Sequence, residues 1–201
     1  MSPEPVLTRE IREGLPAAVL ATSAPAVPSL PFPWQARLLR PGSTDEARLV
    51  HWMAQPHVER FWQQDWPADR WNGYLRAQIA GAYSRPVLVL RDGEPFAYLE
   101  IYRPARDLIS GYYPAGPHDL GLHLAIGDQR HTGRGFGREM VKSLVAQLFT
   151  DDPACELVVA EPDARNVAAV RMFEAAGFRR QAELELPHKT AALMVTVRSA
   201  R

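Results

Sequence analysis

The chain has 201 residues, of which 46% are hydrophobic, so it can bury one sizeable core and is expected to form one main domain. Lysine plus arginine and aspartate plus glutamate each number 23, which argues against a general nucleic-acid binder, because such proteins normally carry a basic excess. The single cysteine, Cys155, excludes an internal disulfide and any multi-cysteine metal site, and we expect it to serve packing.

The sequence does not predict membrane insertion or export. No apolar run approaches the ~18 residues that span a bilayer. The N-terminus carries Glu4, Glu10 and Glu13, where a signal peptide would have a basic start and an apolar stretch. We therefore expect a cytoplasmic protein, with a monomer as the default state.

Residues 1–33 are predicted to form a flexible or surface-draped N-terminal arm, because they are rich in alanine, proline and serine. Prolines at positions 25, 28, 31 and 33 disfavour a regular helix or a central strand there. From Trp34 the pattern changes, and residues 34–201 are predicted to form the folded domain.

Helices and strands are mixed along this domain, and Asp92-Gly93 predicts a tight hairpin. The predicted strands are 34–40, 85–91, 94–102, 119–126, 156–160, 178–186 and 191–198. The predicted helices are 43–53, 58–64, 68–82, 136–149 and 166–176, and 103–117 is predicted as an irregular loop. This order predicts the α+β (mixed α/β) class with one central sheet.

The run from Arg130 to Gly137 has the pattern of a glycine-rich turn that follows a strand and opens a helix. Glycines at 133, 135 and 137 allow a tight turn that exposes several backbone N–H groups in one direction. Together with the positive end of the helix, these groups favour a diphosphate. Arg130 and Arg134 would add positive charge, although surface solvation is the alternative for both.

His123 is the leading candidate for a general base. Its strand alternates leucine or isoleucine with small residues, so His123 is expected on the small-residue face, lining a cleft. The ordinary pKa of histidine lies near neutrality, which suits proton transfer. The alternative is a histidine whose hydrogen bonds are satisfied inside the sheet.

Asp163 is the second candidate, because it follows the strand 156–160 at its carboxyl end, where open mixed sheets tend to place ligands. An aspartate is also a good cap for the helix that begins near Asn166. The residues alone leave both roles open.

The segment 120–178 resembles the Gcn5-related N-acetyltransferase (GNAT) superfamily. Two signature regions carry the resemblance: Arg130-x-x-Gly133-x-Gly135, and Asn166-Val-Ala-Ala followed by Phe173-Glu-x-x-Gly-Phe. The resemblance implies a mostly antiparallel twisted sheet flanked by helices. The acyl-coenzyme A cleft would lie where the middle strands splay apart.

A closer resemblance, to siderophore-biosynthesis acyltransferases, extends over most of the chain after the arm. These enzymes acylate the side-chain nitrogen of lysine or N6-hydroxylysine, as in mycobactin and aerobactin assembly. The matching segments are His51-Trp-Met, Trp66–Trp71, Ala82-Tyr-Ser, Tyr98–Tyr102, Asp107–Tyr113, Asp119–His123 and Glu161-Pro-Asp163. The resemblance implies a small-molecule amine or hydroxylamine acceptor and an acyl-coenzyme A or acyl carrier protein donor. It also pairs His123 with Asp163 in the active site.

The resemblance assigns further residues to the cofactor. Backbone groups near Leu124–Ile126 would meet the developing oxyanion, and Asn166 would approach the pantetheine arm. Phe173 departs from the family pattern, because many members have a tyrosine there that can protonate the leaving thiolate. Phenylalanine cannot, so Phe173 is expected to form a wall beside the cofactor arm. Residues expected to contact the cofactor are thus Leu124, Ile126, Arg130, Gly133, Arg134, Gly135, Phe136, Gly137, Asn166 and Phe173.

A cluster of aromatic residues is expected either to pack in the core or to form a gate for the substrate. Aromatic side chains bury a large area, which favours packing, but a wall for substrate or acyl chain is the alternative. The cluster contains Trp62, Trp66, Trp71, Tyr102, Tyr112 and Tyr113. His57, His118 and His131 have no metal-ligand spacing, so no metal is expected.

Two rival functions stay open at this stage. The first is an acetyltransferase for another amine, such as an aminoglycoside or a hydroxylated diamine. A strongly acidic pocket would favour a polycationic drug, but residues 98–125 supply only Glu100, Asp107 and Asp119. The second is a non-catalytic acyl-coenzyme A binding protein, which Phe173 permits and which the pairing of His123 with Asp163 disfavours.

Overall fold

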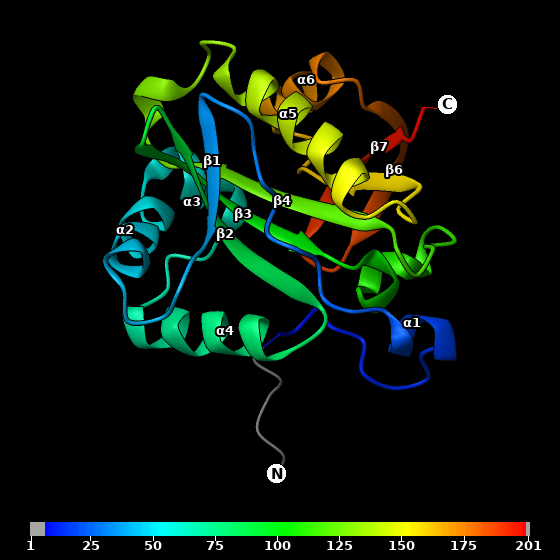
Figure 1. Cartoon of the computed structure of the whole chain (residues 1–201). Coiled ribbons are helices and arrows are strands. Elements are labelled where there is room, and N and C mark those ends of the chain that lie inside the picture. The colour runs from blue at the N-terminus through cyan, green and yellow to red at the C-terminus, as the bar shows by residue number, and fades with distance from the viewer. Residues whose placement is uncertain (1–6, 200–201) are drawn as a thin grey trace.

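The structure is a computed structural model and describes residues 7–199. A seven-stranded sheet with the order β1-β2-β3-β4-β5-β7-β6 forms its centre (Figure 1). Strands β4 and β5 are parallel, whereas the other neighbouring strands are antiparallel. This confirms the predicted α+β class and the mostly antiparallel sheet.

The elements follow the order that the sequence predicts. The strands are β1 (Trp34–Leu38), β2 (Ser84–Arg91), β3 (Glu94–Tyr102), β4 (Leu120–Ile126), β5 (Leu157–Ala160), β6 (Arg179–Leu186) and β7 (Lys189–Val197). The α-helices are α1 (Ala17–Ala21), α2 (Thr44–Met53), α3 (Pro56–Trp62), α4 (Ala68–Ala80), α5 (Phe136–Asp151) and α6 (Val167–Ala175). Short 3₁₀ helices are η1 (Pro104–Arg106), η2 (Leu108–Gly111) and η3 (Gln129–His131).

Local sequence explains the main differences in boundaries. Helix α3 begins at Pro56, two residues before the predicted start, because proline suits the first helical position. It ends at Trp62, because Gln63 adopts a left-handed conformation with φ 54°. The predicted hairpin at Asp92-Gly93 is confirmed, and both residues have the positive φ that a two-residue turn requires.

Helices cover both faces of the sheet (Figure 1). Helices α5 and α6 pack on one face over a core that includes Leu122, Met140 and Phe173. Helices α2, α3 and α4 pack on the other face over Trp71 and Tyr98. Alternation along β4 therefore sends Leu122 to the α5 face and His123 to the opposite face.

The sheet opens between β4 and β5. Their paired residues end at Leu122 and Ala160, although β4 continues to Ile126. The free end of β4 leads through η3 and the glycine-rich turn into α5. The splayed middle strands that the sequence predicted are thus present, and His123 lies where they begin to diverge.

Residues 7–33 lie against the domain. Leu7 and Val19 are buried, and α1 is held by Arg106, whose Nη2 donates to the Val19 carbonyl at 2.8 Å. A short bridge pairs Glu10 with Asp107. The first six residues of the predicted arm lie outside the described residues. No helix within residues 7–199 has the length and apolar character needed to cross a membrane.

Candidate active site

His123 lies between two buried glutamates. Its Nδ1 is 2.8 Å from Glu100 Oε2, and its Nε2 is 2.7 Å from Glu161 Oε1. Glu100 faces it because the antiparallel register of β3 and β4 pairs these two residues directly. Glu161 follows β5 at the point where that strand ends. Both ring nitrogens therefore face a carboxylate oxygen.

Tyr102 and Arg9 complete this network. The Tyr102 ring stacks on the His123 ring at 4.6 Å between centroids, and its hydroxyl donates to Glu161 Oε2 at 2.8 Å. Arg9 Nη2 lies 2.7 Å from Glu161 Oε1 and 2.8 Å from Asp107 Oδ1. Glu161 thus contacts His123, Tyr102 and Arg9 at once.

The network favours a protonated His123. Burial by itself would lower the pKa of His123, but Glu161 and Glu100 outweigh it and raise the pKa to about 9. Burial would likewise raise the pKa of Glu161, yet His123 and Arg9 hold it well below its usual range. At neutral pH His123 is therefore an imidazolium paired with the ionised Glu161.

We expect the free energy of unfolding to depend on pH through the protonation of His123. The folded pKa of His123 lies above its ordinary value of 6.5, so the stabilisation is fully present below pH 6.5 and is lost as the pH rises through about 9. Urea unfolding of the native protein and of His123→Gln should therefore show a stability difference that shrinks over this range. A pH-independent difference would contradict the assignment of an imidazolium.

Gly121 allows the stacked geometry. A Cβ at this position would overlap the Tyr102 ring. Gly121→Ala should therefore displace the ring from His123 and destabilise the protein by about 1–3 kcal/mol, the usual cost of overpacking. Gly111→Ala is the matched control, because a Cβ there meets nothing within 4 Å. Equal urea midpoints for the two variants would show that the Tyr102 stack does not depend on Gly121.

Asp163 is bonded elsewhere. Its carboxylate accepts from the Arg165 guanidinium at 3.0 Å and 2.7 Å and from the Arg165 backbone N–H at 2.8 Å. The residue that contacts His123 is Glu161, two residues earlier, and not the predicted Asp163. Asp163 shapes the turn before α6, and Asn166 is the residue that caps this helix, since its Oδ1 accepts from Ala169 N at 3.1 Å.

The predicted aromatic residues separate into three groups. Tyr102 and Trp62 lie at the centre, and the Trp62 ring meets His123 edge-on at 6.2 Å. Trp66 packs on Trp71 at 4.9 Å and on Tyr74 at 5.4 Å, in the cluster that α4 covers. Tyr112 is 44% exposed and donates to the Glu185 carbonyl at 2.8 Å, and half-buried Tyr113 packs beside the cluster that contains Tyr102.

The free end of β4 is covered by α3. Trp62 Nε1 donates to the Leu124 carbonyl at 3.3 Å, and His57 Nε2 donates to the Ile126 carbonyl at 3.0 Å. These two side chains hold α3 beside the strand whose backbone the sequence assigned to the cofactor. Phe173 belongs to α6 and is buried in the core between this helix and the sheet, with Phe178 edge-on at 5.1 Å.

The glycine-rich turn has the geometry that an anion requires. Gly133 and Gly135 have φ of 71° and 83°, and Gly135 is the N-terminal cap of the sixteen-residue α5. No side chain of the described residues caps this helix start, so its first N–H groups face outward. A diphosphate fits these residues. Arg134 is exposed beside them, whereas Arg130 is paired with Asp128 at 2.6 Å.

Two further residues of the turn serve packing. Phe136 is half-buried, and the Arg91 guanidinium lies 3.9 Å from the centre of its ring. Gly137 lets α5 approach its neighbours, because a Cβ there would come within 2.7 Å of Met172 Sδ and 3.0 Å of Ile126 Cδ1. A larger residue at this position would therefore require the Met172 and Ile126 side chains to shift.

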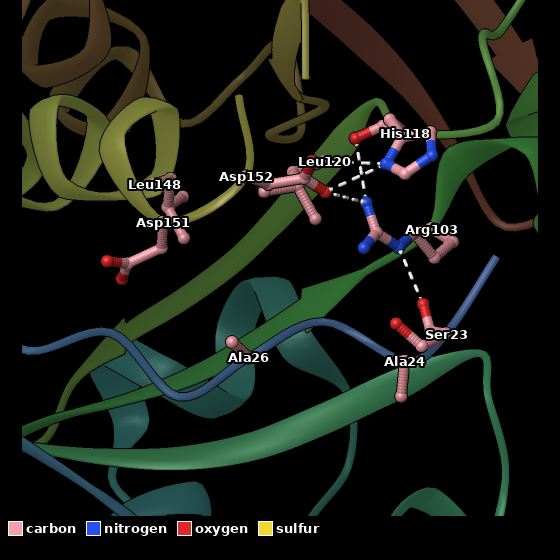
Figure 2. A pocket seen from close by; sticks show the side chains of 9 residues that line it. All are labelled: Ser23, Ala24, Ala26, Arg103, His118, Leu120, Leu148, Asp151 and Asp152. Atoms are coloured by element: carbon pink, nitrogen blue, oxygen red, sulfur yellow. Dashed lines mark hydrogen bonds and ion pairs between the residues drawn. The ribbon is translucent and has the colours of Figure 1, made fainter. Parts of the chain in front are cut away.

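A cavity of about 230 Å³ lies on the face of β4 opposite to His123, against the C-terminal end of α5 (Figure 2). Arg103 contacts Asp152 at 3.0 Å, the His118 carbonyl at 2.7 Å and the Ser23 carbonyl at 3.1 Å. These bonds tie the N-terminal segment to the domain. Within residues 7–199, no three His, Cys, Asp or Glu side chains are arranged to hold a metal ion.

Comparison with known proteins gives consistent matches. The family model for the acetyltransferase (GNAT) domain matches residues 42–186. The lysine N-acyltransferase MbtK of Mycobacterium tuberculosis is 42% identical over 187 residues, which cover 93% of this chain and 88% of that protein. The N(6)-hydroxylysine O-acetyltransferase of Escherichia coli is 31% identical over 155 residues, 77% of this chain and 49% of that protein.

Solved structures show the same fold. An uncharacterized protein from Bacillus halodurans superposes with a TM-score of 0.76 and 30% identity, covering 82% of this chain and 83% of that one. The aminoglycoside acetyltransferase AAC(6')-Ib, solved in complex with coenzyme A, superposes with a TM-score of 0.74 and 26% identity, covering 82% and 95%. The chain therefore belongs to the acetyltransferase (GNAT) family and, within it, to the lysine N-acyltransferase subfamily.

Proposed function

We propose that this protein is a siderophore-biosynthesis N-acyltransferase that acylates the side-chain nitrogen of lysine or N6-hydroxylysine. The observation that carries the proposal is the similarity to MbtK over nearly the whole chain. The buried centre of His123, Glu100 and Glu161 supports it, because this centre combines a proton acceptor with carboxylates that suit an ammonium group.

The donor is proposed to be acyl-coenzyme A, which supplies an acyl group activated as a thioester. Gly133, Gly135 and the first turn of α5 would hold its diphosphate through backbone N–H groups, and Arg134 would add charge. Leu124 and Ile126, on the part of β4 between this turn and His123, would contact the cofactor arm. An acyl carrier protein would be an alternative donor.

His123 is proposed to take the proton that the acceptor nitrogen releases. An amine attacks only in its neutral form, and the ordinary pKa of a lysine amine is near ~10.4. With a pKa of about 9, His123 is a strong base once neutral, although only about 1% of it is neutral at pH 7.

The glutamates connect acceptor binding to this proton transfer. An acceptor ammonium that bonds to Glu100 or Glu161 weakens their hold on the His123 proton, because two cations then share the same carboxylates. The population of neutral His123 would therefore rise when the acceptor is bound. Phe173 carries no transferable proton, which leaves His123 or solvent to return one.

A second candidate is acylation of an aminoglycoside, which the superposition on AAC(6')-Ib favours. The charges around His123 do not favour an aminoglycoside as the acceptor. The three carboxylates of Glu100, Glu161 and Asp107 are offset by Arg9 and His123, so little net negative charge is left for a polycation.

A thiol-release assay tests the proposal. The purified protein is mixed with lysine, N6-hydroxylysine, hydroxycadaverine or kanamycin, each with acetyl- or long-chain acyl-coenzyme A. Release with lysine or N6-hydroxylysine is the expected result, and the faster donor identifies the acyl chain. Release with kanamycin alone would replace the proposed acceptor, and no release with any pair would contradict the proposed donor and acceptor together.

A further inference from the structure

Arg9 reaches the candidate active site from a segment outside the family match, which begins at residue 42. Its backbone is fixed on the domain, since its carbonyl accepts from Leu108 N at 3.1 Å, and Ile11 N donates to the Arg106 carbonyl at 2.8 Å. The Glu10–Asp107 bridge lies between these bonds. The N-terminal segment thus enters as an added strand-like piece that delivers one side chain.

The Arg9 side chain links two carboxylates. Its Nε and Nη2 bond to Asp107 at 3.0 Å and 2.8 Å, and the same Nη2 lies 2.7 Å from Glu161 Oε1. Glu161 Oε1 is also the atom that faces His123 Nε2. The guanidinium and the imidazole therefore compete for one oxygen, while Asp107 holds the guanidinium in place.

We propose that Arg9 is a positioning residue that orients Glu161 and limits how strongly this carboxylate retains the His123 proton. The inference rests on the proposed function only in taking His123 as the proton acceptor. Asp107 accepts from the Ile109 N–H at 2.9 Å and from the Tyr83 hydroxyl, so the anchor is itself held rigidly.

The charge on Arg9 acts on the proton of His123. A positive charge next to Glu161 reduces the negative potential at the imidazole, which lowers the pKa of His123 and opposes the effect of the two glutamates. The titratable and charged groups around this centre come from several parts of the chain and include Arg9, Tyr74, Tyr83, Tyr98, Glu100, Tyr102, Asp107, Glu161, His188 and Lys189. Among them, Arg9 contacts the Glu161 carboxylate, whereas Lys189 Nζ donates to the Glu161 backbone carbonyl at 2.6 Å.

The test is a titration of the His123 imidazole by NMR in histidine-labelled protein, with His123→Gln to assign the signal. Arg9→Gln should raise the midpoint by about one pH unit, because a neighbouring positive charge is removed. Turnover of lysine at pH 7 should then fall about tenfold relative to the native protein, since one unit changes the neutral fraction of His123 tenfold, and this difference should shrink at higher pH. A purely structural role would lower activity equally at all pH values.

Two variants complete the experiment. Arg12→Gln is the matched control. This arginine lies on the same segment, its side chain is 57% exposed, and it pairs with Glu10, so the midpoint should not move. Arg9→Lys keeps the charge but loses the planar fork, and a smaller upward shift is expected. If Arg9→Gln does not fold, Arg9→Lys is measured in its place.

The outcome separates this inference from the proposed function. An unchanged midpoint in a folded Arg9 variant would overturn the role of Arg9, whatever the acceptor. A shifted midpoint without any acyl transfer by the native protein would support the role of Arg9 in setting the proton and would contradict the proposed reaction.

Discussion

Replacing His123 with alanine is expected to lower the rate of lysine acylation by ~10²–10⁴-fold, the range for loss of a general base. The lysine amine is protonated at neutral pH, so its reaction depends on a group that removes the proton. His123 is the group placed for this, between Glu100 and Glu161. Initial rates at saturating acyl-coenzyme A measure the effect.

Two comparisons make this result specific. His118→Ala removes a histidine that pairs with Asp152 beside the cavity at the C-terminal end of α5, so the rate of this variant should stay close to that of the native protein. The side-chain nitrogen of N6-hydroxylysine is much less basic than that of lysine, so His123→Ala should lower its rate of acylation less than that of lysine. Turnover of lysine by His123→Ala at nearly the native rate would refute the assignment of the base.

Gly135→Val is expected to weaken coenzyme A binding about 10- to 100-fold, which corresponds to losing one charge-assisted hydrogen bond of about 1.5–3 kcal/mol. Gly135 has φ of 83°, a conformation that a branched side chain resists, and it directly precedes the first N–H groups of α5. Valine would distort the turn where the diphosphate is expected. Calorimetric titration with coenzyme A measures the affinity.

Gly42→Val is the matched control for this variant. Gly42 has a similar φ of 76°, and a Cβ there meets nothing within 4 Å, so the backbone strain is comparable but remote from the turn. Its affinity for coenzyme A should equal that of the native protein. If Gly135→Val also binds coenzyme A normally, the glycine-rich turn is not the binding site.

The parts of the site that the sequence predicted are those that depend on residues adjacent in the chain. The glycine-rich turn is local, because three glycines and the helix behind them define its geometry without any distant contact. The face of His123 is local too, since alternation along β4 separates it from Leu122. Family signatures then supplied the fold that the structure confirms.

The partners of His123 could not be read in the same way. Glu100 meets it through the register of β3 and β4, which the intervening residues 103–119 set by packing. Glu161 meets it because β5 ends beside β4. The sequence predicted Asp163 and not Glu161 as the partner of His123, but the structure shows the Asp163 carboxylate bonded to Arg165, two residues away.

Arg9 was the least predictable contribution. It lies in the segment whose composition suggested a flexible or surface-draped arm, and about a hundred residues separate it from Asp107. A charged side chain in such a segment carries no local sign that it will be ion-paired. Its role follows from the bridge that places Glu10 beside Asp107.

The most direct test of the central claim is the identity of the product formed from lysine and the preferred acyl-coenzyme A. Tandem mass spectrometry distinguishes acylation at the side-chain nitrogen from acylation at the α-nitrogen. We predict a single product acylated at the side-chain nitrogen, which His123→Ala forms far more slowly. A product acylated only at the α-nitrogen, or no acylated lysine or N6-hydroxylysine with any donor, would contradict the proposed function.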